Sequence, residues 1–169
     1  MTLSPPEPLR GDHQADGFDS GVDVLDAWLR RRARFNEHEG ASRTFVVADD
    51  GRVRAYYTLS AACVSAREVP GRTRRNMPDP IPAVLLGRLA VDRRLQGQGV
   101  ARALVRDAAL RTHRAAEAIG VRCLLVHALS ADVAQFWTHL GFTASSADPL
   151  LLTIRLTDLA AVLDTQPRP

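Results

Sequence analysis

The stretch LLGRLAVDRRLQGQGVAR, residues 85–102, decides the fold class. It starts as an apolar strand, turns through two glycines and continues at once into a long helical pattern. Gly97 and Gly99 have no side chains, so the backbone amides beside them can approach a ligand closely. The first turn of the following helix offers N–H groups and the positive end of the helix dipole, which suit a phosphate. The stretch therefore predicts a strand, a pyrophosphate-binding turn and a helix.

Two better-known phosphate motifs do not fit this turn. A P-loop requires Gly-Lys-Ser or Gly-Lys-Thr, and the chain contains no lysine. The dinucleotide fingerprint requires a third glycine and an acidic residue about 20 positions further on. A glycine turn without any ligand stays the structural alternative.

Outward from this turn, strands and helices alternate along the chain. Apolar runs predict strands at residues 44–48, 53–63, 83–91, 121–128 and 150–156. Helical spacing predicts helices at residues 20–37, 99–119 and 131–140, the first with a capping box of Ser20 and Asp23 and closed by Gly40, the second closed by Gly120. The loop 65–82 is long for a compact domain, which is typical of a functional segment.

The domain organisation follows from this order. We expect an extended lead-in at residues 1–17, a single α+β domain at 18–157 and a tail at 158–169.

Length and composition exclude several classes of protein. The 169 residues are 46% hydrophobic and 24% charged, as in one globular domain. No apolar run is long enough for a membrane span, and the first twenty residues do not resemble a signal peptide. Cys63 and Cys123 each lie within an apolar run, which favours free thiols and a cytoplasmic location. No Cys and His cluster has metal-ligand spacing, so we expect no metal.

The charge is basic and unevenly distributed. Net charge is +3, and all 22 basic residues are arginines. Arginine forks pair well with phosphates, so the groups in 30–34 and 67–75 are consistent with an anionic partner. A solvated basic face in a protein from an arginine-biased genome is the alternative.

Two motifs carry a resemblance to a known family. Arg94-x-x-Gly97-x-Gly99 resembles the pyrophosphate loop of the GNAT acyltransferases, which bind acetyl-CoA, and AQFWTHLGF at 134–142 resembles their second signature. FDSG at 18–21, SRTFV at 42–46, RRNMP at 74–78 and LVHA at 125–128 narrow the resemblance to the acetyltransferase toxins of type II toxin–antitoxin modules, from Leu9 to about Leu156.

This resemblance implies a fold, an activity and partners. The fold is a mixed, mostly antiparallel sheet with helices on both faces and strands that splay at the acetyl-CoA site. The activity is acetylation of the α-amino group of aminoacyl-tRNA, which blocks translation. The implied partners are a ribbon-helix-helix antitoxin and a second copy of the chain, in a homodimer.

The resemblance also implies site residues. Those for acetyl-CoA are Leu89, Ala90, Val91, Arg94, Gln96, Gly97, Gln98, Gly99, Val100, Ala101, Arg102, Ser130 and Phe136. Those for tRNA phosphates are Arg30, Arg31, Arg34, Arg72, Arg74 and Arg75. Core packing for Phe136, helix capping for Ser130, and contact with an acidic antitoxin segment for the arginines stay open.

Trp137 departs from the family pattern. The family has a tyrosine there, whose hydroxyl protonates the departing thiolate, and an indole has no such proton to give. His127, at the end of a strand, is a candidate substitute, or a core histidine bonded to backbone. An α-amino group with a pKa of about 7.7–8.0 is partly neutral at pH 7, and a thiol with a pKa of about 8.5 leaves without full protonation. Such a substrate tolerates the loss of the acid better than a lysine side chain does.

Two rival functions remain. A GNAT enzyme for small amines would need acidic residues in its pocket, and the segments expected to line this one have few. A catalytically impaired module that binds acetyl-CoA or nucleic acid is the other, and Trp137 is its main support.

Overall fold

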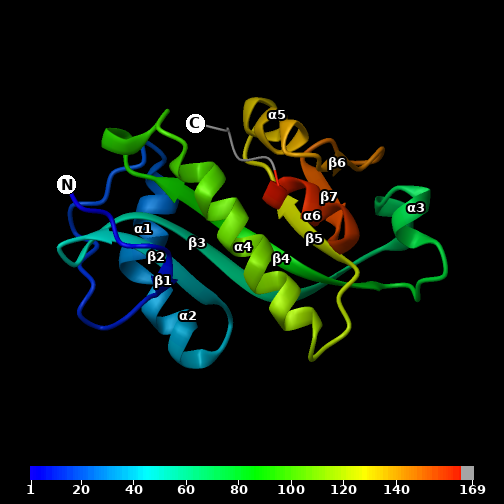
Figure 1. Ribbon diagram of the computed structural model, residues 1–169, viewed down its shortest axis with the longest axis horizontal. Helices are drawn as coiled ribbons and strands as arrows, with labels where there is room; N and C mark the ends of the chain where they lie inside the picture. Colours follow the sequence, from blue (N-terminus) through cyan, green and yellow to red (C-terminus); the bar gives the residue numbers. More distant parts are fainter. Residues whose placement is uncertain (165–169) are drawn as a thin grey trace. The chain divides into compact units, whose positions relative to one another are not determined.

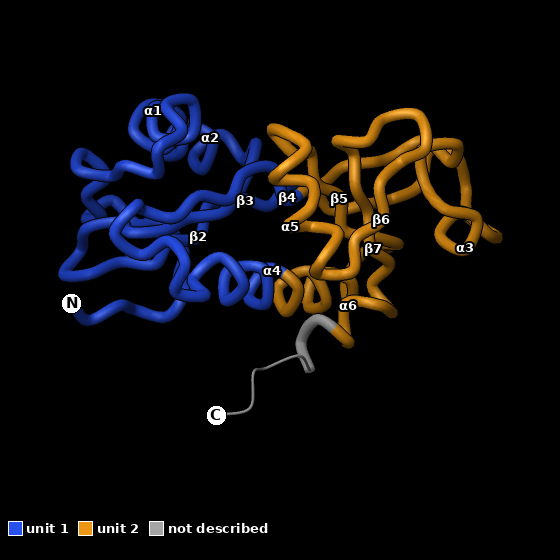
Figure 2. The backbone as a smooth tube through the Cα atoms, turned by 90° about the horizontal axis from the view of Figure 1, so that it is seen from above, with its two compact units in different colours: residues 1–60, 86–108 blue, residues 61–85, 109–169 orange. Residues whose placement is uncertain are grey.

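The computed structural model describes residues 1–164 and divides the chain into two compact units (Figures 1 and 2). Unit 1 comprises residues 1–60 and 86–108, and unit 2 comprises residues 61–85 and the chain from 109 on. One seven-stranded sheet has the strand order β1-β2-β3-β4-β5-β7-β6.

The strands are β1 Glu7–Pro8, β2 Arg43–Asp49, β3 Arg52–Val64, β4 Ile81–Val91, β5 Cys123–His127, β6 Thr143–Ala144 and β7 Leu151–Arg155. The helices are α1 Asp23–Arg31, α2 Ala33–Glu39, α3 Gly71–Arg74, α4 Val100–Ala116, α5 Ala131–His139 and α6 Leu156–Asp164, with short 3-10 turns η1 Ala66–Glu68 and η2 Arg93–Leu95. Each of the five predicted strands is present, with ends that differ by two residues or fewer.

Unit 1 is a layered structure. In Figure 2, α1 and α2 lie on one side of β2 and β3, and the first half of α4 lies on the other. The core beneath α1 is aromatic: the rings of Trp28 and Tyr56 stack with centroids 6.0 Å apart, and Phe18 meets Tyr56 edge-on at 5.6 Å. The Arg88 guanidinium lies 4.1 Å from the Trp28 ring centre, and burial lowers the pKa of Arg88. This packing fixes β4 against α1.

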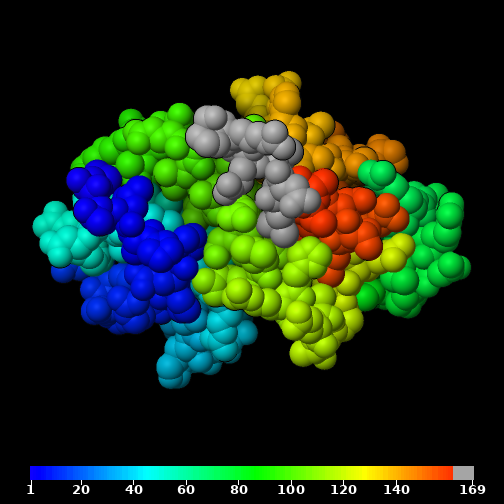
Figure 3. Space-filling view, viewed as in Figure 1, coloured from blue at the N-terminus to red at the C-terminus, as the bar shows by residue number. Residues whose placement is uncertain are grey.

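The first seventeen residues are part of unit 1. Glu7 and Pro8 form β1 against β2, and Leu9 and Ala15 are buried in the aromatic core. Figure 3 shows the start of the chain on the surface beside the β2–β3 region, where Leu3 forms a bridge with Asp49. Only Glu7 and Pro8 of this segment are in a strand, Leu3 and Gln14 form single bridges, and turns occur at residues 11–12 and 16–17.

The start of the first helix differs from the prediction. Val22 is its N-cap, and the predicted capping box is wrong. The buried carboxylate of Asp26 accepts hydrogen bonds from the Ser20 hydroxyl at 2.5 Å and from the Ser20 backbone N–H at 3.1 Å. Ser20 and Asp26 are therefore six positions apart, and the turn at Gly21, with φ +85°, brings their side chains together.

The helix predicted at 20–37 is also two helices, which meet at Arg32. This residue has φ −119° and ends α1, with its N–H donating to Trp28 O at 2.8 Å. Gly40, with φ +76°, ends α2 as predicted. No glycine or proline marks the break at Arg32, so apolar periodicity alone does not reveal it.

Replacing Asp26 provides a test of this helix start. Asp26→Ala leaves a buried N–H and a hydroxyl without their acceptor, so we expect the free energy of unfolding to fall by about 2–4 kcal/mol. Asp23→Ala removes an exposed first-turn carboxylate, and we expect a loss of about 0.3–1 kcal/mol. Urea denaturation of both variants measures the difference. Equal losses would contradict the assignment of Asp26 as the buried partner.

Unit 2 is built on β5 and β7. These strands pair antiparallel from Cys123 opposite Arg155 to His127 opposite Leu151, and β6 pairs with β7. Burial raises the pKa of the free Cys123 thiol to about 11, so this thiol is unreactive near neutral pH. Cys63 is also a free thiol.

In unit 2, the end of one helix, the loop 65–82 and the start of the tail differ from the prediction. Helix α4 ends at Ala116, so Gly120 does not cap it. The loop predicted at 65–82 contains η1, α3 and the start of β4. The predicted tail at 158–169 begins within α6, where Leu159 is fully buried, and its residues 165–169 lie outside the described residues.

No helix within residues 1–164 is long and apolar enough to cross a membrane. Over the same residues, no group of three or more His, Cys, Asp or Glu side chains is arranged to hold a metal ion.

Candidate functional site

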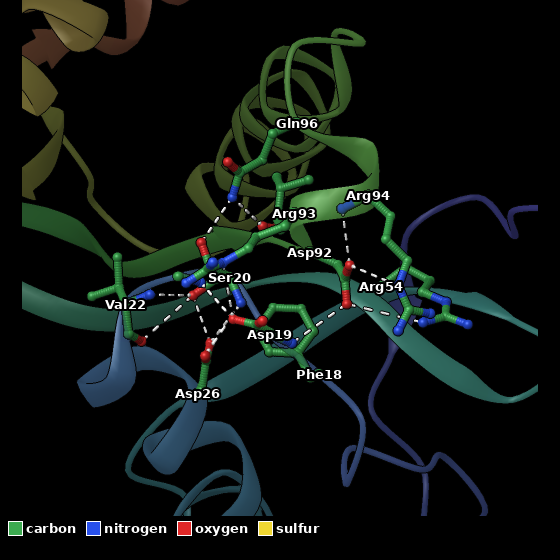
Figure 4. Close-up of polar contacts among 12 residues, drawn as sticks. Phe18, Asp19, Ser20, Val22, Asp26, Arg54, Asp92, Arg93, Arg94 and Gln96 are labelled. Atoms are coloured by element: carbon green, nitrogen blue, oxygen red, sulfur yellow. Dashed lines mark hydrogen bonds and ion pairs between the residues drawn. The ribbon is translucent and has the colours of Figure 1, made fainter.

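The turn after β4 is held by a buried carboxylate. Asp92 is 1% exposed and caps η2, because its Oδ1 accepts from the Arg94 N–H at 3.1 Å. Its other oxygen lies 3.4 Å from the Asp19 N–H. Leu95 is buried below the same turn. Asp92 therefore joins the turn to the segment that precedes α1, as Figure 4 shows.

Gln96 provides a second attachment. Its side-chain Nε2 donates to Ser20 O at 2.8 Å and to Val91 O at 2.9 Å, so it ties the turn to both neighbouring segments (Figure 4). Gln98 Nε2 donates to Arg94 O at 3.0 Å and closes the turn on itself. These contacts hold the backbone between η2 and α4 in place.

Gly97 and Gly99 have the conformation that the sequence suggested. Their φ angles are +76° and +83°, a region that L-residues with side chains avoid. A Cβ built at either position meets no atom within 4 Å, so open space lies beside both. Helix α4 starts at Val100, and the first N–H groups of a helix have no acceptor within the helix. The turn from Gly97 to Gly99 therefore forms a backbone cradle beside open space, directly before the first N–H groups of α4.

The strand before the turn has two kinds of position. Ala90 and Val91 are buried, and Leu89 is half-buried. A ligand that pairs with this strand would bind its main-chain N–H and C=O groups. The three side chains are apolar and do not compete for those hydrogen bonds.

In unit 2, the residues that the family resemblance assigned to the site lie at the start of α5 and within it. The hydroxyl of Ser130 caps this helix by accepting from the Val133 N–H at 3.3 Å, so the capping interpretation of Ser130 is confirmed. Trp137 is 4% exposed and meets Phe136 and Phe142 edge-on, each at 5.1 Å between ring centres. The half-buried Phe136 therefore packs against Trp137 on one side.

The structure excludes one reading of His127. Its side chain is exposed at the end of β5, so it is not a core histidine. The four preceding residues of β5, Cys123 to Val126, are all buried, and only the last residue of the strand, His127, is exposed.

The six arginines expected at tRNA are all exposed, and they differ in their partners. Arg30 Nη1 donates to Phe18 O at 3.2 Å, Arg34 donates to His13 O, and Arg74 Nη1 donates to Val69 O at 3.1 Å. Arg31 and Arg75 have no side-chain hydrogen bond or ion pair with any residue in the described part of the chain. Because α1 and α2 are separate, Arg30 and Arg34 do not lie on one continuous helix.

Arg72 has acidic surroundings. The hydrogen bond from Arg155 lowers the pKa of Asp158, and the charge of Arg72 lowers it further by a smaller amount. Arg72 thus already lies near a carboxylate in unit 2.

The sequence did not reveal the residues that support the turn. Asp92, Asp19 and Ser20 hold it, and they come from two segments more than seventy residues apart. An aspartate directly after an apolar strand and before two arginines is the one local signal for this role.

Comparison with known proteins gives consistent matches. A family model described as an acetyltransferase (GNAT) domain matches residues 40–144. The chain is 44% identical over 160 residues to the tRNA-acetylating toxin of Mycobacterium tuberculosis, and the alignment covers 95% of this chain and 96% of that protein.

Solved structures agree with these matches. AtaT complexed with acetyl-methionyl-tRNAfMet is similar with a TM-score of 0.88 and 28% identity, over 95% of this chain and 99% of that chain. A tyrosine-to-phenylalanine mutant of AtaT bound to the C-terminus of the antitoxin AtaR and acetyl-CoA is similar with a TM-score of 0.81 and 29% identity, over 98% of this chain and 100% of that chain.

Proposed function

We propose, from the premise that this chain belongs to the GNAT acetyltransferase family, that it transfers the acetyl group of acetyl-CoA to the α-amino group of aminoacyl-tRNA. The observation that carries the proposal is the cradle of Gly97 and Gly99 before α4, in a chain 44% identical to a tRNA-acetylating toxin. The consequence of this chemistry is a block of translation, so the protein acts as a toxin in the cytoplasm.

The cradle fits the pyrophosphate of acetyl-CoA. Open space lies beside both glycines, and the amides of Val100 to Arg102 belong to the first turn of α4, which is the positive end of that helix. We assign the amides from Gln96 to Arg102 to the pyrophosphate. We assign pairing with the pantetheine amides to the backbone of Leu89, Ala90 and Val91. For unit 2 taken by itself, we assign contacts with the acyl group to Phe136 and Ser130, as the family resemblance implies, and we propose no metal in the reaction.

The chemistry makes modest demands on the protein. The amine nitrogen bonds to the thioester carbonyl carbon, the carbon–sulfur bond breaks, and the amine proton and the thiolate both leave. The free amine is already partly populated at neutral pH, because an α-amino group has a pKa of about 7.7–8.0. Positioning supplies much of the rate, since an oriented pair of reactants can gain about 7–11 kcal/mol.

Trp137 provides no acid at the family's tyrosine position. Its buried indole fills the space between Phe136 and Phe142. We propose that it shapes the acyl pocket and that water, or the exposed imidazole of His127, protonates the thiolate.

The tRNA contacts come from arginines whose side chains have no partner within residues 1–164. Arg31 and Arg75 are the best placed to bind phosphates, whereas Arg30, Arg34 and Arg74 already donate to backbone carbonyls.

For each of Arg31→Gln and Arg75→Gln, we expect the slope of log Kd against log salt to fall by about 1. The matched control is Arg43→Gln on β2, whose guanidinium is already paired with Glu37 at 3.5 Å. Filter binding of charged tRNA from low to moderate salt measures the slope, and an unchanged slope in both variants would reject these contacts.

A toxin of this kind requires a partner that neutralises it. We propose a ribbon-helix-helix antitoxin, with an acidic segment that competes with tRNA for the same arginines, and a homodimeric toxin. The similar structure of AtaT with the C-terminus of AtaR supports the proposal of an antitoxin. The similar structure of AtaT with acetyl-methionyl-tRNAfMet supports the proposal of a tRNA substrate.

The experiment is a single-turnover assay with purified protein, radiolabelled acetyl-CoA and total tRNA charged with mixed amino acids. We expect label in N-acetyl-aminoacyl-tRNA. Label in spermidine or an aminoglycoside offered in parallel, with none in tRNA, would favour a small-amine acetyltransferase. Binding of acetyl-CoA without transfer to tRNA or to a small amine would indicate that the protein is a binding module and not an enzyme.

A further inference from the structure

Unit 1 contains a cavity that the proposed function has not used. Its volume is about 270 Å³, and it lies between the start of β3, the segment before α1 and η2. The residues that line it are Gln14, Asp16, Gly17, Phe18, Arg52, Val53, Arg54 and Arg94. Three of them are arginines and one is an aspartate, so the lining is basic.

Arg54 is the unusual member of this lining. Its side chain is 9% exposed, and its buried Nε has no hydrogen-bond partner within residues 1–164. Its two terminal nitrogens lie 3.9 Å from Asp92 Oδ2 and 3.9 Å from Asp49 Oδ2, which is beyond hydrogen-bonding distance. Figure 4 shows this guanidinium beside Asp92 and Arg94.

Both neighbouring carboxylates already accept other donors. Asp92 accepts from the Arg94 N–H at 3.1 Å, and Asp49 accepts from the Thr2 N–H at 3.0 Å. They offset the charge of Arg54 without hydrogen-bonding to it. A buried Nε–H without an acceptor is costly, because an unsatisfied donor of a charged group forfeits its hydration.

We propose that this cavity is a binding site for a phosphate group. Arg54 would form its floor, and the exposed guanidinium groups of Arg52 and Arg94 would close over the oxygens. A phosphate has several acceptor oxygens in the geometry that guanidinium forks prefer, so one group can accept from Arg54, Arg52 and Arg94 together, which a single water cannot do. Asp16 is the one carboxylate of the lining, and Asp92, which lies 3.9 Å from Arg54 and 3.8 Å from Arg94, offsets part of the arginine charge.

Two substrates of the proposed reaction carry such a group: the 3′-phosphate of acetyl-CoA and the backbone phosphates of tRNA. Arg94 connects the cavity to the glycine cradle, since it belongs to the same turn. The identity of the phosphate donor rests on the proposed function, whereas phosphate binding itself does not.

The test uses the Nε–H signal of Arg54 in a nitrogen-15 NMR spectrum of the full chain, assigned by its loss in Arg54→Lys. We expect this signal to move on titration with inorganic phosphate and to stay in place with sodium chloride at equal ionic strength. Arg52→Gln, at an exposed position, should weaken phosphate binding about 10-fold, the effect of one charge-assisted hydrogen bond. Arg93→Gln is the matched control, because Arg93 pairs with Asp19 at 3.2 Å and does not line the cavity.

The same signal then distinguishes the two donors. A shift with acetyl-CoA that is absent with 3′-dephospho-acetyl-CoA assigns the site to the cofactor, and a shift with tRNA alone assigns it to the nucleic acid. Arg54 signals unmoved by phosphate, acetyl-CoA and tRNA, or equal phosphate affinity in Arg52→Gln and the wild type, would overturn the proposal. A cavity that binds phosphate in a protein that acetylates nothing would instead overturn only the proposed function.

Discussion

Trp137→Tyr is expected to acetylate aminoacyl-tRNA about 100 times faster than Trp137→Phe in single-turnover experiments, because a positioned general acid typically contributes 10²–10⁴-fold. The two variants differ by one hydroxyl group. Both replace the indole with a smaller ring between Phe136 and Phe142, so they share the same loss of packing. The ratio of their rates therefore measures the contribution of the hydroxyl group as an acid and not the effect of the lost packing.

The wild type provides the second comparison in this series. If Trp137 only shapes the pocket, Trp137→Phe should stay within about 10-fold of the wild-type rate, which is less than the loss of a positioned acid. Equal rates for Trp137→Tyr and Trp137→Phe would mean that a hydroxyl at this position donates no proton in this protein. The pH dependence of the faster variant, measured from pH 6 to 9, should then follow the substrate amine alone.

The strands and the turn were predictable because their signals are local. Apolar runs located all five predicted strands, and the two glycines of the turn specified a conformation that side chains disfavour. The predicted GNAT fold is confirmed by the family match and by the similarity to AtaT. Short elements such as β1 and β6 have two residues each, too few for any periodicity to show.

The polar contacts of the site were not predictable in the same way. Asp26 was missed as the partner of Ser20 because a turn, and not a helical repeat, sets their spacing. Arg54 is one of 22 arginines, and the distances of its guanidinium from Asp49 and Asp92 depend on where these residues lie in three dimensions. One sequence-level signal did exist, since Arg52 and Arg54 alternate on β3 and so share one face of the sheet.

Gly97→Asp is expected to weaken acetyl-CoA binding by 100-fold or more while the protein stays folded. A carboxylate about 5 Å from a phosphate charge repels it by about 3 kcal/mol at the effective dielectric of a protein surface, and a tenfold change in affinity corresponds to about 1.4 kcal/mol. Open space beside Gly97 means that the new side chain meets no protein atom within 4 Å of its Cβ. Aspartate also tolerates the left-handed conformation at φ +76° better than most residues.

Two controls separate charge from backbone strain. Gly97→Asn has the same shape without the charge and keeps the backbone N–H, so we expect its acetyl-CoA affinity to fall about 10-fold or less, which is about 1.4 kcal/mol or less. Gly40→Asn imposes the same change at the same φ of +76°, at the end of α2, and also meets no atom within 4 Å. It should lose as much unfolding free energy as Gly97→Asn and none of the acetyl-CoA affinity. Calorimetric titration and thermal melts measure the two quantities, and equal affinity in Gly97→Asp and Gly97→Asn would place the pyrophosphate away from this turn.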